Sequence, residues 1–194
     1  MAERRAKVTR ENKETSVKVE LNIDGSSQFE ITTGIRFFDH MLSQLAQHGI
    51  IDLKVSATGQ DQHHVVEDVA ICLGRALNQA LGDRKGIIRM SDATVPMDDT
   101  LATVALDIGG RSYTVFEAHF DQNKIEDMSA DLARHFFVSF ACEAKLNVHA
   151  KVLSGINDHH KVEALFKALA RALDSATRID ERIAGRIPST KDKI

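Results

Sequence analysis

Hydrophobic and polar residues alternate near the start of the chain in the way typical of strands with one buried face. Apolar side chains occupy every second position of residues 17–23, which predicts a half-buried strand. The pair Asp24–Gly25 predicts a turn after it, and we expect residues 28–32 to return as the second strand of a hairpin. The polar residues 1–15 are expected to form an arm or an edge strand.

The rest of the chain changes between helical and strand periodicity in a repeated order. A helix is expected over residues 37–48, then a strand over 51–57, and then a helix that begins near His63 and stops at Gly82. Residues 83–96 are expected to form a connector. The second half repeats the order, with predicted strands at 101–108, 111–120 and 146–153 and predicted helices at 132–143 and from 159 onward.

These elements describe an α+β protein made of two copies of one half-domain. Each half has the expected order ββαβα, with helices packed on mainly antiparallel sheets. The first half, with its connector, is expected to span residues 1–95, and the second half, with a C-terminal tail, residues 96–194. Together the halves are expected to form one compact catalytic domain.

A histidine-rich motif begins the last helix of each half. His63-His64-Val65-Val66-Glu67 and His159-His160-Lys161-Val162-Glu163 share the form His-His-x-x-Glu and recur half a chain apart. Upstream of them, His40 and His135 form another pair, one residue out of that register. Each half therefore delivers three histidines and one glutamate.

Helix geometry makes this motif a candidate metal site. Residues four apart share a helix face, so His63 can stand beside Glu67 and His159 beside Glu163. Neighbouring residues point about 100° apart, so a His-His pair suggests two ions. The side chains then divide into two sets of three nitrogens and one carboxylate, which suit manganese, iron, cobalt or zinc better than calcium or magnesium. A six-coordinate ion would keep positions open for substrate.

Composition narrows the class of protein. The chain has 194 residues, 43% of them hydrophobic, and a formal net charge of -3; it is long enough for a core, and its charge argues against general nucleic-acid binding. Residues 1–16 lack the apolar segment of a secretory signal, and no apolar run approaches a membrane span. Cys72 and Cys142 have no disulfide-like or metal-like spacing, so we expect two buried thiols in a cytoplasmic protein without a membrane partner.

Several residues are candidates for holding an anion. Arg111 directly follows Gly109–Gly110, a turn at which the backbone can approach a ligand. Lys167 lies four residues after Glu163, on the helix face that carries the candidate ligands. With Arg89 in the connector and Ser189-Thr190-Lys191 in the tail, these groups offer the fork donors, ammonium groups and hydroxyls that bind phosphate.

A set of short motifs, spread over nearly the whole chain, resembles one known enzyme family. The motifs are Phe38-Asp39-His40-Met41-Leu42, His63-His64-Val65-Val66-Glu67-Asp68, Pro96-Met97-Asp98, Gly110-Arg111, Arg134-His135-Phe136, Asn157-Asp158-His159-His160 with Glu163, Phe166-Lys167-Ala168 and Pro188-Ser189-Thr190-Lys191. In this order they are similar to those of the imidazoleglycerol-phosphate dehydratase family. The chain departs from that family at Gln62, Val65 and Asp192, where aspartate, threonine and glycine are usual. The first two departures lie next to candidate metal ligands and bear on how these ligands are supported.

The resemblance implies a lyase of histidine biosynthesis, a branch of amino-acid biosynthesis. Such a hydro-lyase converts imidazoleglycerol phosphate into imidazole-acetol phosphate and water. The resemblance further implies a dimanganese enzyme, with two Mn²⁺ per subunit and a substrate imidazolate that bridges them. It also implies the half-domain fold of domain 2 of ribosomal protein S5, and a homo-oligomer, of 24 subunits in the family, with metal sites at subunit contacts.

The resemblance also implies a role for each candidate residue. Glu14 is the candidate proton shuttle and substrate contact, and Asp98 is a second catalytic candidate that orients a ligand or relays a proton. The implied metal ligands are His40, His63, His64, Glu67, His135, His159, His160 and Glu163, and the implied phosphate-binding residues are Arg89, Arg111, Lys167, Ser189 and Lys191.

Three other functions stay open on the residues alone. A metal-binding or storage module would need no anion-binding residues. A dinuclear hydrolase of phosphate esters would use similar metals, although such sites usually lean on aspartates. A nucleic-acid binder is compatible with this type of half-domain, but the acidic net charge and the lack of a basic stripe argue against it.

Overall fold

The computed structural model describes residues 3–183 and 185–194 of the chain. In its first half, β1 (Arg5–Glu11), β2 (Thr15–Asn22), β4 (Asp52–Gly59) and β3 (Phe29–Thr32) form a sheet in that order. Strands β1 and β4 are antiparallel to β2, and β3 is parallel to β4. Helix α1 (Arg36–Gly49) connects β3 to β4, and α2 (Gln62–Leu81) follows β4.

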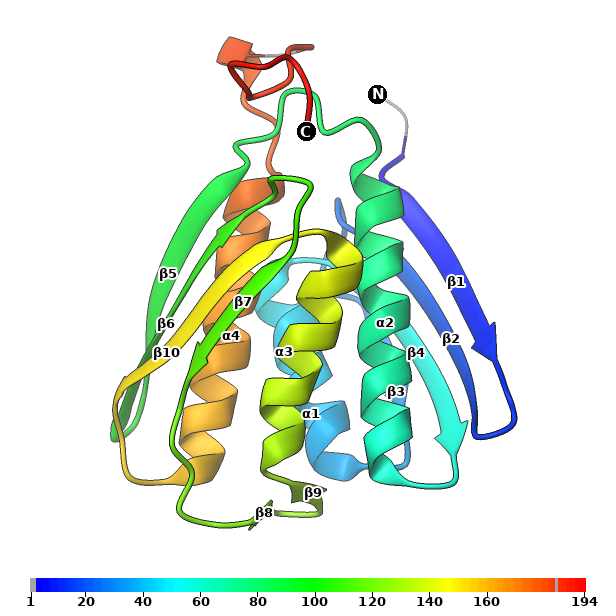
Figure 1. Ribbon diagram of the computed structural model, residues 1–194, viewed down its shortest axis with the longest axis vertical. Helices are drawn as coiled ribbons and strands as arrows, with labels where there is room; N and C mark the ends of the chain where they lie inside the picture. The colour runs from blue at the N-terminus through cyan, green and yellow to red at the C-terminus, as the bar shows by residue number, and fades with distance from the viewer. Residues whose placement is uncertain (1–2, 184) are drawn as a thin grey trace.

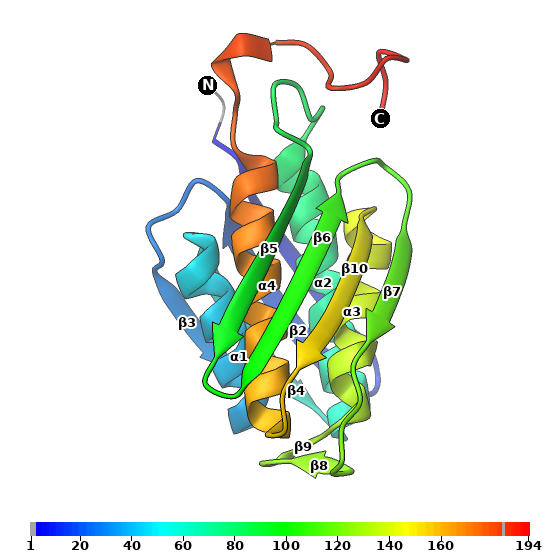
Figure 2. The same cartoon turned by 90° about the vertical axis from the view of Figure 1, so that its left-hand side faces the viewer.

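The second half repeats this arrangement. The order of its sheet, seen face-on in Figure 2, is β5 (Met90–Met97), β6 (Thr100–Asp107), β10 (Asn147–Ser154) and β7 (Tyr113–Glu117). Helices α3 (Asp131–Ala144) and α4 (Asp158–Thr177) take the places of α1 and α2. An added hairpin, β8 (Lys124–Ile125) with β9 (Met128–Ser129), precedes α3, and a short 3₁₀ helix (Glu181–Ile183) lies in the tail.

The four helices lie between the two sheets, so the molecule has one shared interior (Figure 1). Each helix has an apolar stripe that meets a sheet on one side and another helix on the other. The centre is aromatic: Phe136 and Phe140 stack with ring centroids 5.8 Å apart, and Phe166 lies 4.9 Å from Phe136. These rings are fully buried, and Phe38 of the first half lies 5.6 Å from Phe136 of the second, so the aromatic packing joins the halves.

All four helices begin at the end of the molecule where β8 and β9 lie, whereas the C-terminal tail lies at the opposite end (Figures 1 and 2). This parallel arrangement gathers four helix N-termini in one place. The partial positive charge of helix N-termini stabilises carboxylates nearby. We call this the N-terminal end of the helices.

The α+β class and the duplication are confirmed, and so is the edge strand near the N-terminus, which is β1. The predicted hairpins are wrong: β3 and β7 pair in parallel with β4 and β10. The reason is that both edges of β2 are taken by β1 and β4, so β3 joins the free edge of β4 through a helical crossover. Half of the predicted connector is strand β5, so each half is βββαβα, and the predicted boundary at residues 95/96 falls inside β5.

Two smaller expectations have clear outcomes. Gly82 ends α2 with a positive φ of 55°, as predicted for a glycine at a helix C-terminus. Cys72 is buried, but Cys142 is exposed, because it falls on the face of α3 that points away from the core. In the described parts of the chain, none of the helices combines the length and hydropathy that a membrane crossing requires.

Candidate metal centre

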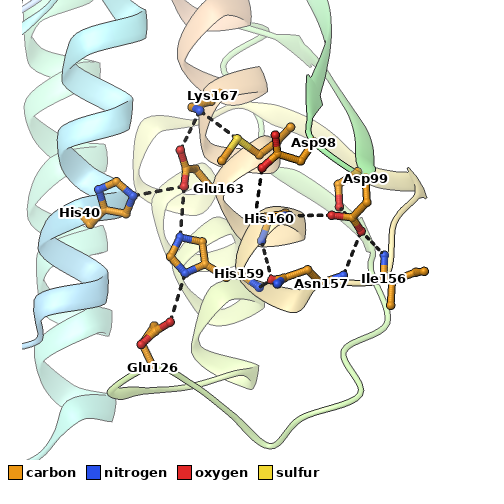
Figure 3. Close-up of polar contacts among 12 residues, drawn as sticks. His40, Asp98, Asp99, Glu126, Ile156, Asn157, His159, His160, Glu163 and Lys167 are labelled. Atoms are coloured by element: carbon orange, nitrogen blue, oxygen red, sulfur yellow. Dashed lines mark hydrogen bonds and ion pairs between the residues drawn. The ribbon is translucent and has the colours of Figure 1, made fainter.

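The first of two side-chain clusters joins α1 to α4, and we call it the His40 cluster. His159 and Glu163 lie one turn apart on α4, and the Oε2 atom of Glu163 lies 3.2 Å from His159 Nε2. The same oxygen lies 3.2 Å from Nε2 of His40 on α1 (Figure 3). One ligand atom from each of these residues lies within 4.8 Å of the other two, which is close enough for a single ion to contact all three.

The second cluster joins α2 to α3, and we call it the His135 cluster. His63 and Glu67 lie one turn apart on α2, and the ring of His63 stacks on that of His135 with centroids 4.5 Å apart. Glu67 Oε1 lies 3.7 Å from Nε2 of His135. This Nε2 atom is buried and has no hydrogen-bond partner within the described residues. A buried ring nitrogen without a partner is costly, and a metal ion would satisfy it.

Both clusters therefore fit a divalent transition metal by the nature and spacing of their donors. The i, i+4 pairs that the sequence predicts do meet. The third member of each cluster comes from the other half of the chain: His40 completes the pair on α4, and His135 the pair on α2. Each half thus contributes one histidine to the cluster of the other half. The spacing of residues within either half does not indicate this.

The other two candidate ligands, His64 and His160, lie outside both clusters. Each stands one position along the helix from a cluster histidine and points to a different side, as adjacent helical residues must. His64 is directed toward Asp61 and Glu14, and His160 toward Asp99 and Asp98. Within one chain the structure therefore assembles two nitrogens and one carboxylate per cluster, not the expected three nitrogens and one carboxylate.

Tight turns bring the helix starts close to the strands before them. A Cβ atom on Gly59 would lie 2.6 Å from Val65 Cγ2, and one on Gly155 would lie 2.2 Å from Thr100 Oγ1. A side chain at Gly59 would therefore collide with the start of α2, and one at Gly155 would collide with the start of β6. Asp61 and Asn157 then cap α2 and α4 by accepting backbone N–H groups of the histidine motifs.

Charged groups around the His40 cluster keep its carboxylate ionised. Burial favours the neutral form of Glu163, but hydrogen bonds from Lys167 and His40 outweigh burial and hold the pKa of Glu163 below its ordinary value. The Lys167 ammonium lies 2.7 Å from Glu163 Oε1 and donates to the sulfur of Met97. The carboxylate therefore faces the two imidazoles in the charged state that a cation requires.

The hairpin β8–β9 closes this end of the molecule and ties the halves together. Asp127 accepts the backbone N–H groups of Arg36 and Phe37 at the start of α1, each at 2.9 Å. Gln62, one of the departures from the family pattern, donates to the carbonyl of Asp127. Next to it, Glu126 Oε1 lies 3.4 Å from His159 Nδ1. The hairpin thus contacts the start of three helices.

Sequence reasoning did not single out Asp61, Asp99, Glu126 or Asp127. Asp61 carried a usable signal, because an aspartate three residues before the second histidine is a typical N-cap. The other three act through contacts between segments far apart in the chain, and no local pattern marks them. Val65, another departure from the family pattern, is buried against Gly59.

The candidate anion-binding residues do not meet in one chain. Lys167 lies by the His40 cluster, whereas the N–H of Arg89 donates to the carbonyl of Ala176 near the far end of α4. At 1.5 Å per residue, this carbonyl is about 20 Å along the helix from Glu163. The Arg89 guanidinium is held by Asp107 at 2.7 and 3.0 Å and by the Pro188 carbonyl.

The remaining anion candidates lie near Arg89. Arg111 follows the turn after β6, and its carbonyl accepts from Asn147 at the start of β10. Ser189 and Lys191 lie in the tail, where the Ser189 hydroxyl accepts the backbone N–H of Lys191. Asp192, the third departure from the family pattern, has a positive φ of 52°, a conformation that glycine adopts without strain. The C-terminal tail, which carries Ser189, Lys191 and Asp192, lies at the end of the molecule opposite β8 and β9, where the helices begin (Figure 1).

The fold is a duplicated α+β fold, and each of its two histidine–glutamate clusters takes residues from both halves. These features are those of a protein that binds a pair of metal ions. Residues 33–173 match the family model described as imidazoleglycerol-phosphate dehydratase. The chain belongs to this family.

Individual relatives agree with the family match. An imidazoleglycerol-phosphate dehydratase of Dehalococcoides mccartyi (strain ATCC BAA-2266 / KCTC 15142 / 195) is 60% identical over 191 residues, which cover 98% of this chain and 97% of the relative. One from Methanothermobacter thermautotrophicus is 55% identical over 194 residues, covering 98% of each.

Solved structures of the family have the same fold. The crystal structure of imidazoleglycerol-phosphate dehydratase from Staphylococcus aureus superposes with a TM-score of 0.84 at 34% identity, covering 91% of this chain and 99% of that one. The crystal structure of IGPD from Pyrococcus furiosus, in complex with (S)-C348, gives 0.84 at 35% identity, covering 96% and 100%.

Proposed function

We propose that the chain removes water from imidazoleglycerol phosphate to give imidazole-acetol phosphate, a step of histidine biosynthesis in the cytoplasm. The observation that carries this proposal is the pair of histidine–glutamate clusters in a member of a dehydratase family. An imidazole substrate has two ring nitrogens, and two clusters offer one metal position for each. A storage module would not need this pairing, nor the basic residues that accompany it.

We further propose that the clusters hold two Mn²⁺ ions per subunit. His40, His159 and Glu163 would hold one ion, and His63, Glu67 and His135 the other. Imidazole nitrogens with one carboxylate suit manganese, and also its neighbours in the first transition row. When bound, the ions would supply Lewis-acid sites for the two ring nitrogens of the substrate.

The chain's own residues supply the proton transfer in this proposal. The reaction removes the hydroxyl from the carbon attached to the ring and a proton from the next carbon, and the resulting enol tautomerises to the ketone of the product. Glu14 is our candidate to move that proton, because its carboxylate is half exposed on the β1–β2 turn and lies 3.5 Å from His64 Nε2. Asp98 occupies the matching position in the second half, 3.5 Å from His160 Nε2.

The separation of the site residues supports an assembly of several copies. His64 and His160 point away from the clusters of their own chain, and Arg89, Arg111, Ser189 and Lys191 lie at the far end of it. A glycerol phosphate is much too short to connect the clusters to residues about 20 Å further along the helix. We propose that neighbouring subunits complete both the metal ligand sets and the phosphate site, in a homo-oligomer of the 24-subunit type implied by the family resemblance.

The test is product formation by the purified chain. Metal-free protein should be inactive, and added Mn²⁺ should restore formation of imidazole-acetol phosphate from imidazoleglycerol phosphate, followed by ultraviolet absorbance. Release of inorganic phosphate would instead indicate a phosphate-ester hydrolase. Metal binding without consumption of substrate would indicate a storage module.

A further inference from the structure

The two histidines outside the clusters share the same surroundings. The Nδ1–H of His64 donates to Asp61 Oδ2 at 2.7 Å, and the Nδ1–H of His160 donates to Asp99 Oδ1 at 2.6 Å. On the opposite edge of each ring, Nε2 lies 3.5 Å from a second carboxylate, Glu14 or Asp98. The same pattern of carboxylate, imidazole and carboxylate therefore occurs once in each half (Figure 3 shows the second).

The halves build this pattern from different elements. Asp61 is the N-cap of α2: one oxygen accepts the backbone N–H of His64 while the other accepts its ring N–H. In the second half Asn157 is the cap, and the carboxylate comes from Asp99 in the β5–β6 turn. If the aspartates served only to cap helices, the second half would not need Asp99 beside the ring.

The Asp99 carboxylate is itself fixed in place. Its Oδ2 atom accepts the backbone N–H groups of Ile156 and Asn157. With the ring N–H of His160 on Oδ1, the carboxylate therefore accepts three hydrogen bonds that fix its orientation. A charged acceptor on Nδ1 leaves the ring only one orientation and one free nitrogen.

We infer that Asp61 and Asp99 are positioning residues, which fix His64 and His160 with Nδ1–H inward and Nε2 free, beside Glu14 and Asp98, to bind a metal ion. This inference rests on the proposed function, since it takes the two histidines as ligands. Histidines that bind metals usually donate their other ring N–H to such a partner, and loss of the partner typically weakens metal binding about 10- to 100-fold.

Asparagine substitutions separate positioning from helix capping. In Asp61→Asn and Asp99→Asn the side-chain carbonyl can still accept the backbone N–H groups, while the amide that replaces the other oxygen cannot accept the ring N–H. Asp61→Ser offers the same separation with a different capping group. Asn157→Ala is the matched control, because it removes the cap of α4 and leaves Asp99 beside His160.

The measurement is a Mn²⁺ titration of each metal-free protein, with free Mn²⁺ followed by electron paramagnetic resonance. Asp61→Asn should weaken one of the two sites about 10- to 100-fold, Asp99→Asn the other, and the double variant both. The melting temperature of each metal-free protein should stay at that of the parent. Asn157→Ala should melt at a lower temperature but bind Mn²⁺ as the parent does.

The outcomes separate this inference from the proposed function. Unchanged Mn²⁺ affinity in Asp61→Asn, Asp61→Ser and Asp99→Asn, with weakened affinity in His64→Ala and His160→Ala, would overturn the positioning role alone. Unchanged affinity in both histidine variants would overturn the ligand assignment on which both proposals depend.

Discussion

The Nε2 atom of His40 lies 3.2 Å from the Oε2 atom of Glu163, although 123 positions separate the two residues in the chain. This contact joins α1 of the first half to α4 of the second. The His135 cluster makes the reciprocal connection from α3 to α2. Neither half alone contains a cluster, so the candidate metal sites depend on how the two halves pack together.

The first prediction concerns this carboxylate. Glu163→Gln should lower the bound Mn²⁺ from about two ions per chain to about one, since the amide loses the charge that offsets a cation. Elemental analysis of protein loaded with Mn²⁺ and then dialysed measures the count. Glu143→Gln is a control on α3, where the carboxylate pairs with Arg75 away from either cluster. An equal loss in both variants would contradict the assignment.

The second prediction concerns the proton transfer. Glu14→Gln should fold and bind Mn²⁺ as the parent does, but its kcat should fall about 10²- to 10⁴-fold, the usual contribution of general acid–base catalysis. Glu11→Gln, at the exposed end of β1 in the same hairpin, should keep normal turnover. A near-normal kcat in Glu14→Gln would remove this residue from the reaction.

The third prediction concerns a buried ion pair at the start of α4. Lys161 Nζ donates to Asp158 Oδ1 at 2.8 Å and to the carbonyl of His119, and both charged side chains are almost fully buried. Lys161→Met should lower the free energy of unfolding by about 3–5 kcal/mol, because it leaves a buried charge without its partner.

A surface pair provides the comparison. Lys54 lies 3.5 Å from Glu30 with both side chains largely exposed, so Lys54→Met should cost no more than about 1 kcal/mol. Urea unfolding of the metal-free proteins measures both values. Similar losses of unfolding free energy in the two variants would show that the buried Lys161–Asp158 pair stabilises the fold no more than a surface pair does.

The fourth prediction follows from the ionisation of Asp158. Burial favours its neutral form, but hydrogen bonds from Lys161 and from the backbone N–H groups of Asp121 and Gln122 hold its pKa below the ordinary value. A lowered pKa in the folded state adds stability at pH values above the unfolded pKa, about 3.9. That stability is lost as the pH falls through the folded pKa.

Asp158→Asn isolates this contribution. The variant should be less stable than the parent at pH 7, and the difference between the two unfolding free energies should narrow as the pH falls below about 4. Urea unfolding of both metal-free proteins at a series of pH values measures the difference. A difference that stays constant down to acid pH would show that Asp158 gains nothing from ionisation.

The sequence predicts the central elements of each half because their signals are local. The i, i+4 spacing of His159 and Glu163 places both on one face of α4, and the structure brings them together as expected. Strand β5 was missed because it is an edge strand whose alternation covers only Ala93, Val95 and Met97 and is interrupted by Pro96; Val95 is its one buried residue. Such a strand is specified by its neighbour β6 more than by its own residues.

The arrangement of the site was less predictable than its members. Residue spacing cannot show that His40 lies beside Glu163, because this contact depends on how α1 packs against α4. The same holds for Arg89, which sequence reasoning grouped with Lys167 and which lies near the other end of α4. If one phosphate needs both residues, they must come from different copies of the chain. Local sequence patterns do not show contacts between copies.

The central claim is that two ions lie where the halves and neighbouring copies meet, and anomalous X-ray diffraction from crystals of the Mn²⁺-loaded assembly tests it most directly. We predict two manganese peaks per chain, one at His40, His159 and Glu163 and one at His63, Glu67 and His135, each also contacted by His64 or His160 of another copy. Peaks elsewhere, or clusters without manganese in crystals of active enzyme, would contradict the account.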